Sequence, residues 1–228
     1  PLALTSDVDS PNYNTGSLTV AFTANGTTAD QLTINNQGTG AGQIGISGSN
    51  VTFGGVTIGT FSGGANGTNL VITFTTATAT PAAVQALLQN IQYANSSDNP
   101  STAARTLTWT LVDGDGTANG GADTTTATAT INVTAVNDAP VNTVPGAQVV
   151  AEDTALVFSG AAAISVNDVD GNLTSTRLTV TNGTLAVSLT GGATISAGAN
   201  NSATLTLAGT QTQINAALAT LVYQGKLD

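Results

Sequence analysis

The chain of 228 residues contains no cysteine, no histidine and no methionine. The lack of cysteine rules out a disulfide framework and thiolate zinc sites. A nucleophilic triad needs a histidine or cysteine, and a glycosidase needs two carboxylates across a cleft, which the neighbouring Asp113 and Asp115 do not supply. No glycine-rich stretch leads into the Gly-Lys-Ser/Thr of a phosphate loop. The sequence therefore predicts that the protein is not an enzyme.

Positive charge is scarce as well. Three Lys and Arg residues accompany 13 Asp and Glu residues, which gives a formal net charge of −10 at pH 7. A chain of this charge repels a phosphate backbone, so we expect no nucleic-acid partner. The apolar runs are shorter than the roughly 20 residues that a membrane-spanning helix needs, so we expect no membrane insertion.

The residues present in quantity favour β-structure. The chain is 40% hydrophobic and 7% charged, and it has 26 glycines. Apolar and polar residues alternate in several short stretches, which is typical of strands with one buried face. These stretches are LTVAFTA, LVITFTTA, TLTWTLV, TATINVTAV, RLTVTNG and ATLTLAG. Because each is short and bounded by turn residues, the pattern predicts an all-β fold made of antiparallel sandwiches.

Two stretches of the chain occur twice. Residues 6–20, SDVDSPNYNTGSLTV, match residues 167–180, NDVDGNLTSTRLTV. Residues 80–95, TPAAVQALLQNIQYAN, match residues 210–225, TQTQINAALATLVYQG. The order of these matches predicts two consecutive modules with one fold.

We place the first β-sandwich module at residues 1–136, and the linker with the second module at residues 137–228. The first module carries a Gly-rich insertion at residues 38–68, which we expect to form an added hairpin. It lacks the N-terminal strand segment of the second copy, and the second copy lacks the C-terminal strands of the first. We therefore interpret the chain as a window from a longer repetitive protein.

Each module is expected to contain one short helix. In the first copy Val84, Leu87, Leu88 and Ile91 have helical spacing. Thr80 is suited to cap this helix and Pro81 to occupy its first position. Core packing explains the apolar stripe without a ligand.

Most of the acidic residues are paired or lie beside the expected linker. They are Asp7/Asp9, Asp113/Asp115, Asp138, Glu152/Asp153 and Asp168/Asp170. Two carboxylates one residue apart in an extended segment project to the same side and repel each other unless a cation lies between them. With hard oxygen ligands only, the chemistry favours Ca²⁺. Asp-Gly and Asn-Asp are also ordinary turn sequences, and for DGDG at Asp113 and Asp115 both interpretations stay open.

The remaining acidic residues stand alone. They are Asp30, Asp98, Asp123 and Asp228. We expect them to be isolated in loops, where, unlike the pairs, they need no special explanation.

Three motifs follow one another around the module junction: AVNDAPV at residues 135–141, AEDTA at residues 151–155 and NDVDGN at residues 167–172. Their order resembles the linker, the first-strand acid and the Asp-x-Asp turn of bacterial cadherin-like, VCBS-type repeats. Such repeats occur in tandem in giant RTX-type adhesins and surface proteins. The resemblance implies tandem Ig/cadherin-like sandwiches at the bacterial cell surface, with Ca²⁺ held between modules.

Carried over to this chain, the resemblance makes Asn137 and Asp138 the linker ligands and adds Asp168 and Asp170 from the second module. Asp7, Asp9, Glu152, Asp153, Asp113 and Asp115 are further candidate metal ligands on the pairing argument. The expected function is that of a structural extender or adhesin repeat, which adjacent repeats continue and Ca²⁺ stiffens. Fewer acidic residues than in animal cadherins imply fewer or weaker ions at each junction.

Two alternatives remain from the sequence. Neighbouring chains could complete each other's sandwiches through unpaired sheet edges and form a homo-oligomeric extracellular fibre. The chain could instead bind a glycan or another surface ligand with calcium in its loops. For that alternative Tyr13 is the stacking candidate, because Trp109, Tyr93 and Tyr223 lie at positions typical of a core.

Overall fold

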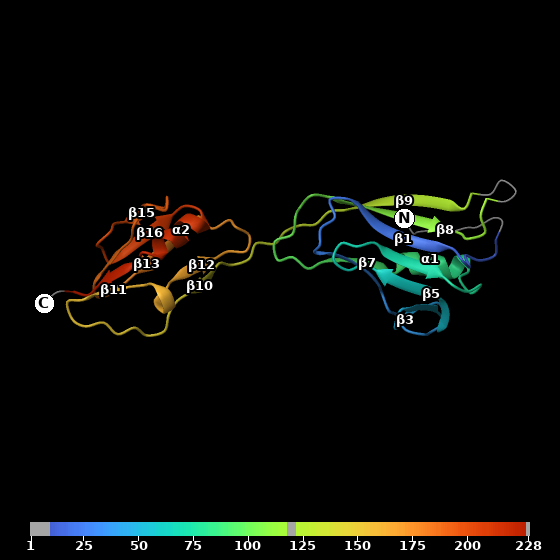
Figure 1. The fold of residues 1–228 in the computed structure, drawn as a ribbon, viewed down its shortest axis with the longest axis horizontal. Helices are drawn as coiled ribbons and strands as arrows, with labels where there is room; N and C mark the ends of the chain where they lie inside the picture. The colour runs from blue at the N-terminus through green and yellow to red at the C-terminus, as the bar shows by residue number, and fades with distance from the viewer. Residues whose placement is uncertain (1–9, 118–121, 227–228) are drawn as a thin grey trace. The chain divides into compact units, whose positions relative to one another are not determined.

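The computed structural model describes residues 10–117 and 122–226. The chain divides into two compact units, Pro1–Ala135 and Val136–Asp228, called module 1 and module 2 here. Both consist mainly of antiparallel strands and each has one short α-helix (Figure 1). This confirms the predicted all-β, sandwich-like fold. No helix in the described part of the chain is long and apolar enough to cross a membrane.

Module 1 contains a seven-stranded antiparallel sheet in the order β3-β4-β5-β6-β1-β8-β9 and a two-stranded sheet, β2-β7. Its elements are β1 (Ser17–Ala24), β2 (Asp30–Ile34), β3 (Ile44–Ser47), β4 (Asn50–Phe53), β5 (Val56–Gly63), β6 (Leu70–Phe74), α1 (Pro81–Gln89), β7 (Ile91–Asn95), β8 (Arg105–Val112) and β9 (Thr124–Ile131). The alternating residues Leu18, Val20, Ile72 and Leu107 point into one core and are almost fully buried.

The Gly-rich insertion forms β3, β4 and β5 and widens the large sheet at one edge. Gly54 and Gly55 connect β4 to β5 with φ angles of 59° and 82°. Two consecutive positive φ angles are what a tight two-residue hairpin needs, and glycine adopts them without steric cost. The hairpin expected in this region is therefore present.

Helix α1 begins where the sequence predicts. The Thr80 hydroxyl accepts a hydrogen bond from the Ala83 N–H at 3.4 Å, and Pro81 occupies the first turn. Val84 and Leu87 are fully buried against the core of module 1, and Leu88 is partly buried beside them. The helix ends at Gln89, so Ile91, which the spacing placed in the helix, is instead the first residue of β7. Packing thus accounts for the apolar stripe.

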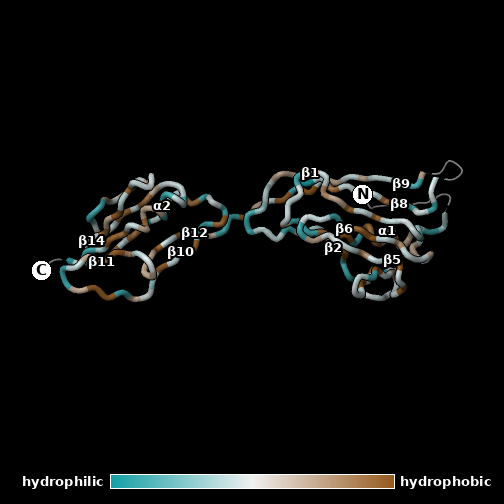
Figure 2. The backbone as a smooth tube through the Cα atoms, viewed as in Figure 1, coloured by the Kyte–Doolittle hydropathy of each residue, from teal (hydrophilic) through white to brown (hydrophobic). Residues whose placement is uncertain are grey.

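Module 2 is built from three small antiparallel sheets, β10-β12, β11-β17-β14 and β13-β16-β15. Its elements are β10 (Val141–Thr143), β11 (Ala155–Val157), a 3₁₀ turn (Gly160–Ala162), β12 (Ser165–Asn167), β13 (Ser175–Thr179), β14 (Thr184–Ala186), β15 (Thr194–Gly198), β16 (Thr204–Ala208), α2 (Gln211–Leu218) and β17 (Val222–Gln224). Leu205, Leu207 and Ile214 are fully buried in a core separate from that of module 1. In Figure 2 many of the apolar stretches of each module lie along its strands and its helix.

The sequence repeat corresponds to a structural repeat. Leu32 of β2 pairs with Tyr93 of β7, and Leu185 of β14 pairs in the same register with Tyr223 of β17. The pair β1·β6 likewise corresponds to β13·β16, and α1 to α2. Several strands lack a counterpart in the described part of the other module. Among them are β8 and β9, which extend the sheet beyond β1, and β11, which pairs with β17.

Candidate functional site

The residues predicted to bind metal at the junction form a hydrogen-bonded cluster within module 2. Asp138 donates its backbone N–H to Asp170 Oδ2 at 2.6 Å. Asn172 Nδ2 donates to Asn137 Oδ1 at 2.5 Å. Asp168 Oδ1 accepts the Asp170 N–H at 3.0 Å. These five residues, called the linker cluster below, join the start of module 2 to the turn that follows β12.

Helix α2 positions this turn. Gln211, the first residue of α2, accepts the Asp168 N–H on its Oε1 at 2.7 Å and donates from Nε2 to Asn167 at 3.2 Å. One turn further along, Asn215 exchanges two hydrogen bonds with the backbone of Val166, at 2.8 and 2.9 Å. The amide side chains of α2 thus pair with β12 as a neighbouring strand would. The sequence-based prediction of the site did not include Gln211, Asn215 or Asn172. The only signal for them was the placement of one polar residue a helical turn after another in QTQIN.

The cluster explains how Asp168 and Asp170 lie close together. Asp168 is 6% exposed, and Asp170 is half-buried. Each carboxylate accepts a backbone N–H, from Asp170 and from Asp138 respectively. Each N–H group places partial positive charge beside a carboxylate, so these donors offset part of the repulsion for which the sequence suggested a cation.

The donor set fits a hard divalent cation. Asp168, Asp170 and Asn137 place carboxylate and amide oxygens in one cluster, and such oxygens are ligands that Ca²⁺ accepts. Among residues 10–117 and 122–226, however, no three acidic, His or Cys side chains are arranged to hold a metal ion. The two carboxylates are therefore a partial ligand set, which amide oxygens, backbone carbonyls and water would have to complete.

The other acidic pairs lie elsewhere. Asp7 and Asp9 are outside the described residues. Asp113 and Asp115 belong to the turn after β8, in which Asp113 Oδ1 accepts the Asp115 N–H at 3.2 Å. The DGDG turn belongs to module 1, whereas the linker cluster lies in module 2.

Glu152 and Asp153 are exposed in a turn before β11. Asp153 adopts a left-handed backbone conformation with φ 56°, and the Thr154 hydroxyl donates to the Glu152 carbonyl at 3.2 Å. Strand β11 begins opposite Gln224, near the end of module 2. The structure does not bring this pair to the linker cluster.

The sequence-based role of Tyr13 as a stacking platform is wrong. Tyr13 is 2% exposed and packs against Phe74 with ring centroids 6.1 Å apart. The ring is buried because it packs against apolar side chains of the core, although the loop that carries it is polar. Trp109 is partly buried against the same core, as the sequence predicts.

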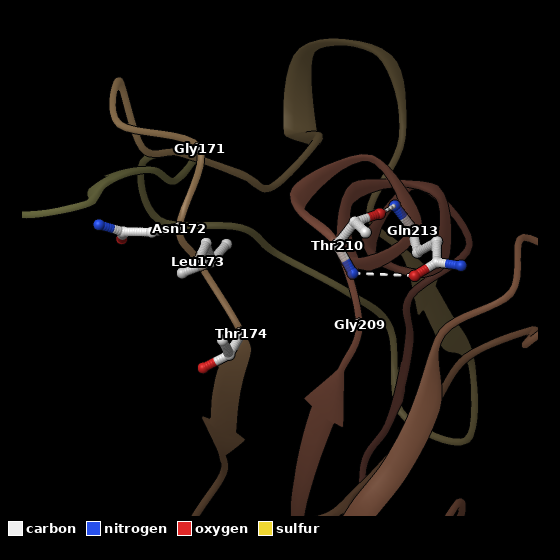
Figure 3. A pocket seen from close by; sticks show the side chains of 7 residues that line it. All are labelled: Gly171, Asn172, Leu173, Thr174, Gly209, Thr210 and Gln213. Carbon is white, nitrogen blue, oxygen red and sulfur yellow. Dashed lines mark hydrogen bonds between the residues drawn. The ribbon is translucent and has the colours of Figure 1, made fainter. Parts of the chain in front are cut away.

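An open pocket of about 550 Å³ lies beside the Asp168–Asn172 turn (Figure 3). Thr210 and Gln213 on its helical side bond each other: the Thr210 N–H donates to Gln213 Oε1 at 2.8 Å, and the Gln213 N–H donates to Thr210 Oγ1 at 3.3 Å. Asn172 points away from them in Figure 3, and no aromatic residue lines the pocket. Its polar groups cap α2 instead of facing a ligand.

A second polar cluster, in module 1, was not predicted. We expected Asp30 alone in a loop, but it is the first residue of β2 and is fully buried. Its Oδ1 accepts hydrogen bonds from the Tyr93 hydroxyl at 2.6 Å and from Asn95 Nδ2 at 2.7 Å. Its Oδ2 accepts from the N–H and the hydroxyl of Thr27, at 2.7 and 3.0 Å. These contacts correct the expectation that Asp30 is isolated in a loop.

The counterion of Asp30 is Arg105, which is also fully buried. Arg105 Nε lies 3.3 Å from Asp30 Oδ1, and Nη1 donates to the carbonyls of Ser101 and Ala103. Within the described residues Nη2 has no hydrogen-bond partner. The sequence held one signal for this ion pair. Arg105 is a single cation at the start of an apolar strand, and a cation that is buried there needs an acidic partner.

This cluster perturbs the pKa values of Asp30 and Tyr93. Burial raises the pKa of Asp30, but the hydrogen bonds from Tyr93, Asn95 and Thr27 outweigh it and lower the pKa to about 2. Burial, and then the hydrogen bond to Asp30, raise the pKa of Tyr93. Asp30 is therefore ionised, and Tyr93 protonated, over the whole neutral range.

No protein-family description, curated protein or solved structure matches the chain significantly.

Proposed function

We propose that the chain is a tandem structural repeat of a bacterial extracellular or cell-surface protein. It acts as a spacer, which extends the protein and displays its other parts. Ca²⁺ bound at the linker cluster stiffens the start of module 2. The observation that carries the proposal is the pair of contacts that fix the linker, Asp138 N–H to Asp170 and Asn172 to Asn137. A linker held in this way cannot swivel freely at its junction with the module.

The separate cores support a spacer. Each module buries its own apolar cluster, so each has the means to fold as a unit, and force along the chain would act on the segment between them. A spacer of this kind needs that segment to be held in one conformation. The contacts of Asn137 and Asp138 supply this within module 2.

Calcium would add charge compensation to the same contacts. Asp168 and Asp170 would bind the ion with their carboxylates, and Asn137 would contribute its amide oxygen. Extracellular calcium modules bind with Kd of about 10⁻⁴–10⁻³ M. At a calcium concentration a hundredfold above Kd, one site would stabilise module 2 by about 2.7 kcal/mol.

Calcium titration of the whole chain tests the proposal. We expect a bound ion by calorimetry and a higher melting temperature of module 2 than in chelator, with slower amide exchange at Asp138 and Asp170. The double variant Asp168→Asn/Asp170→Asn should lose these responses. The matched control is Asp113→Asn/Asp115→Asn, which removes the same number of charges from the DGDG turn of module 1 and should keep these responses.

A single substitution separates the ion from the hydrogen bond. Asp170→Asn keeps an oxygen acceptor for the Asp138 N–H but removes a charge, whereas Asp170→Ala removes both. We expect both variants to lose calcium affinity and only the alanine variant to speed amide exchange at Asp138 in chelator. Calcium binding that survives in the double asparagine variant would contradict the proposed site.

A further inference from the structure

The two modules differ at one sheet edge. In module 2, β17 lies between β14 and β11. In module 1, its counterpart β7 pairs with β2 on one side. On the other side of β7, no strand lies within residues 10–117 and 122–226. The same element is thus a central strand in one module and an edge strand in the other.

The equivalence of β7 and β17 is residue by residue. Both follow a helix capped by a threonine, and Leu32 is paired with Tyr93 as Leu185 is with Tyr223. In module 2, β11 places Leu156 opposite this tyrosine. The geometry that receives β11 in module 2 is therefore repeated in module 1.

The backbone of β7 presents hydrogen-bonding groups on the open side. The Asn35 N–H donates to the Asn90 carbonyl, and the Ser96 N–H donates to the Ala29 carbonyl, so the even-numbered residues face β2. Since antiparallel pairing alternates, Ile91, Tyr93 and Asn95 direct their N–H and C=O groups to the open edge. The corresponding carbonyl of Leu221 accepts the Phe158 N–H at 2.9 Å in module 2.

Exposure along the two strands agrees with this difference. Leu221 is 1% exposed, whereas its counterpart Ile91 is only partly buried. Gln92 and Ala94 are exposed, whereas Val222 and Gln224 in the same positions are partly buried. β11 accounts for the lower exposure in module 2.

The edge also lacks the usual protection against strand addition. Natural edge strands carry charges, prolines or bulges that prevent pairing with another chain. The β7 sequence, IQYAN, has neither charge nor proline, and its pairing with β2 is regular over all its residues. Nothing in β7 opposes a further strand.

We propose that the open edge of β7 binds an extended β11-type strand by antiparallel addition, with the leucine of the incoming Ala-Leu-Val-Phe stretch opposite Tyr93. The occupant is an extended strand of this alternating chemistry from outside the described residues, because β11 itself is paired with β17. The phenylalanine would lie opposite Ile91, as Phe158 bonds Leu221 in module 2. This inference does not depend on calcium or on the linker cluster.

The test uses the whole chain and a synthetic peptide of residues 149–159, VVAEDTALVFS. We expect the peptide to bind and to slow amide exchange at Ile91, Tyr93 and Asn95, measured by NMR. In module 2 Leu156 forms its hydrogen-bonded pair with Tyr223, and Val157 does not pair in this way. A peptide N-methylated at the Leu156 position should therefore fail to bind, while one methylated at the Val157 position should still bind.

Three outcomes would overturn the proposal. The first is unchanged exchange in β7 at millimolar peptide. The second is a response that maps to Leu221 and Tyr223, since it means that the peptide replaces β11 in module 2. The third is a chain that dimerises without peptide and is then protected at Tyr93, because the occupant would be a second copy. Ultracentrifugation of the chain alone decides the last point.

Discussion

Replacing Asp30 by asparagine should destabilise module 1 more than any comparable change of a surface acid. The carboxylate accepts hydrogen bonds from Thr27, Tyr93 and Asn95 and compensates the charge of Arg105. An asparagine offers one oxygen, and its NH₂ group would face other donors. Removing one partner of a buried ion pair costs about 3–5 kcal/mol, because the other charge remains buried. Against a domain stability of about 5–15 kcal/mol, this is a large fraction.

The low pKa of Asp30 also predicts how the stability of module 1 depends on pH. The pKa falls from its ordinary value of 3.8 to about 2 in the folded chain. A carboxyl group whose pKa is lowered by folding stabilises the fold fully above pH 3.8, and this contribution is lost as the pH falls toward 2. At about 1.4 kcal/mol per pH unit, the loss is roughly 2 kcal/mol. The Asp30→Asn variant has no such group and should not show this part of the acid dependence.

The fluorescence of Trp109 provides the assay. This residue is the single tryptophan of the chain and lies partly buried in β8, so its fluorescence follows the unfolding of module 1 alone. Guanidinium titrations between pH 7 and pH 2 give the free energy of unfolding for the wild type and the variant. Asp98→Asn is the matched control, because Asp98 is exposed and its loss should change stability by less than about 0.5 kcal/mol.

A second variant keeps the prediction testable if the Asp30→Asn protein does not fold. Tyr93→Phe removes only the 2.6 Å hydrogen bond to Asp30, and should cost about 1.5–3 kcal/mol. It should also raise the pKa of Asp30 and move the acid loss of stability to higher pH. The reasoning is refuted if Asp30→Asn unfolds at the wild-type denaturant concentration, or if all variants lose stability in parallel between pH 4 and pH 2.

The cores, caps and turns give three further predictions. Leu205→Ala should destabilise module 2 by about 2–5 kcal/mol, measured by amide exchange, and leave the unfolding transition of Trp109 unchanged, since the cores are separate. Thr210→Ala removes the capping box of α2 and should speed amide exchange in that helix, with a cost of about 1 kcal/mol. Gly114→Ala should lower the fluorescence-detected stability of module 1 more than Gly116→Ala; both have positive φ, but only at Gly114 would a Cβ lie 2.3 Å from a backbone nitrogen.

Local features of the fold could be predicted because they repeat at fixed short spacings. The alternation of strand residues, the helix behind Thr80 and the glycine hairpin each depend on residues within a few positions of one another. The repeat extended these predictions to module 2. The turn at Asp168 and Asp170 was recognised for the same reason, since the two acids stand one residue apart.

Contacts between distant residues followed only from the tertiary structure. Asp30 and Arg105 are 75 positions apart, and no motif around either residue indicates that the two form an ion pair. The hydrogen bond between Asp138 and Asp170 spans 32 positions, and the resemblance to other repeats implied only that both residues are ligands of one ion. The burial of Tyr13 against Phe74 likewise depends on which side of the loop faces the core.

The sequence by itself determined the all-β class, the two copies of one module and the helix of each, because periodicity is a property of neighbouring residues. Only the tertiary structure decided which charges are buried together, how the linker is held and which edge of β7 has no partner strand among the described residues. Those features depend on strand register, which brings together residues that the chain keeps far apart.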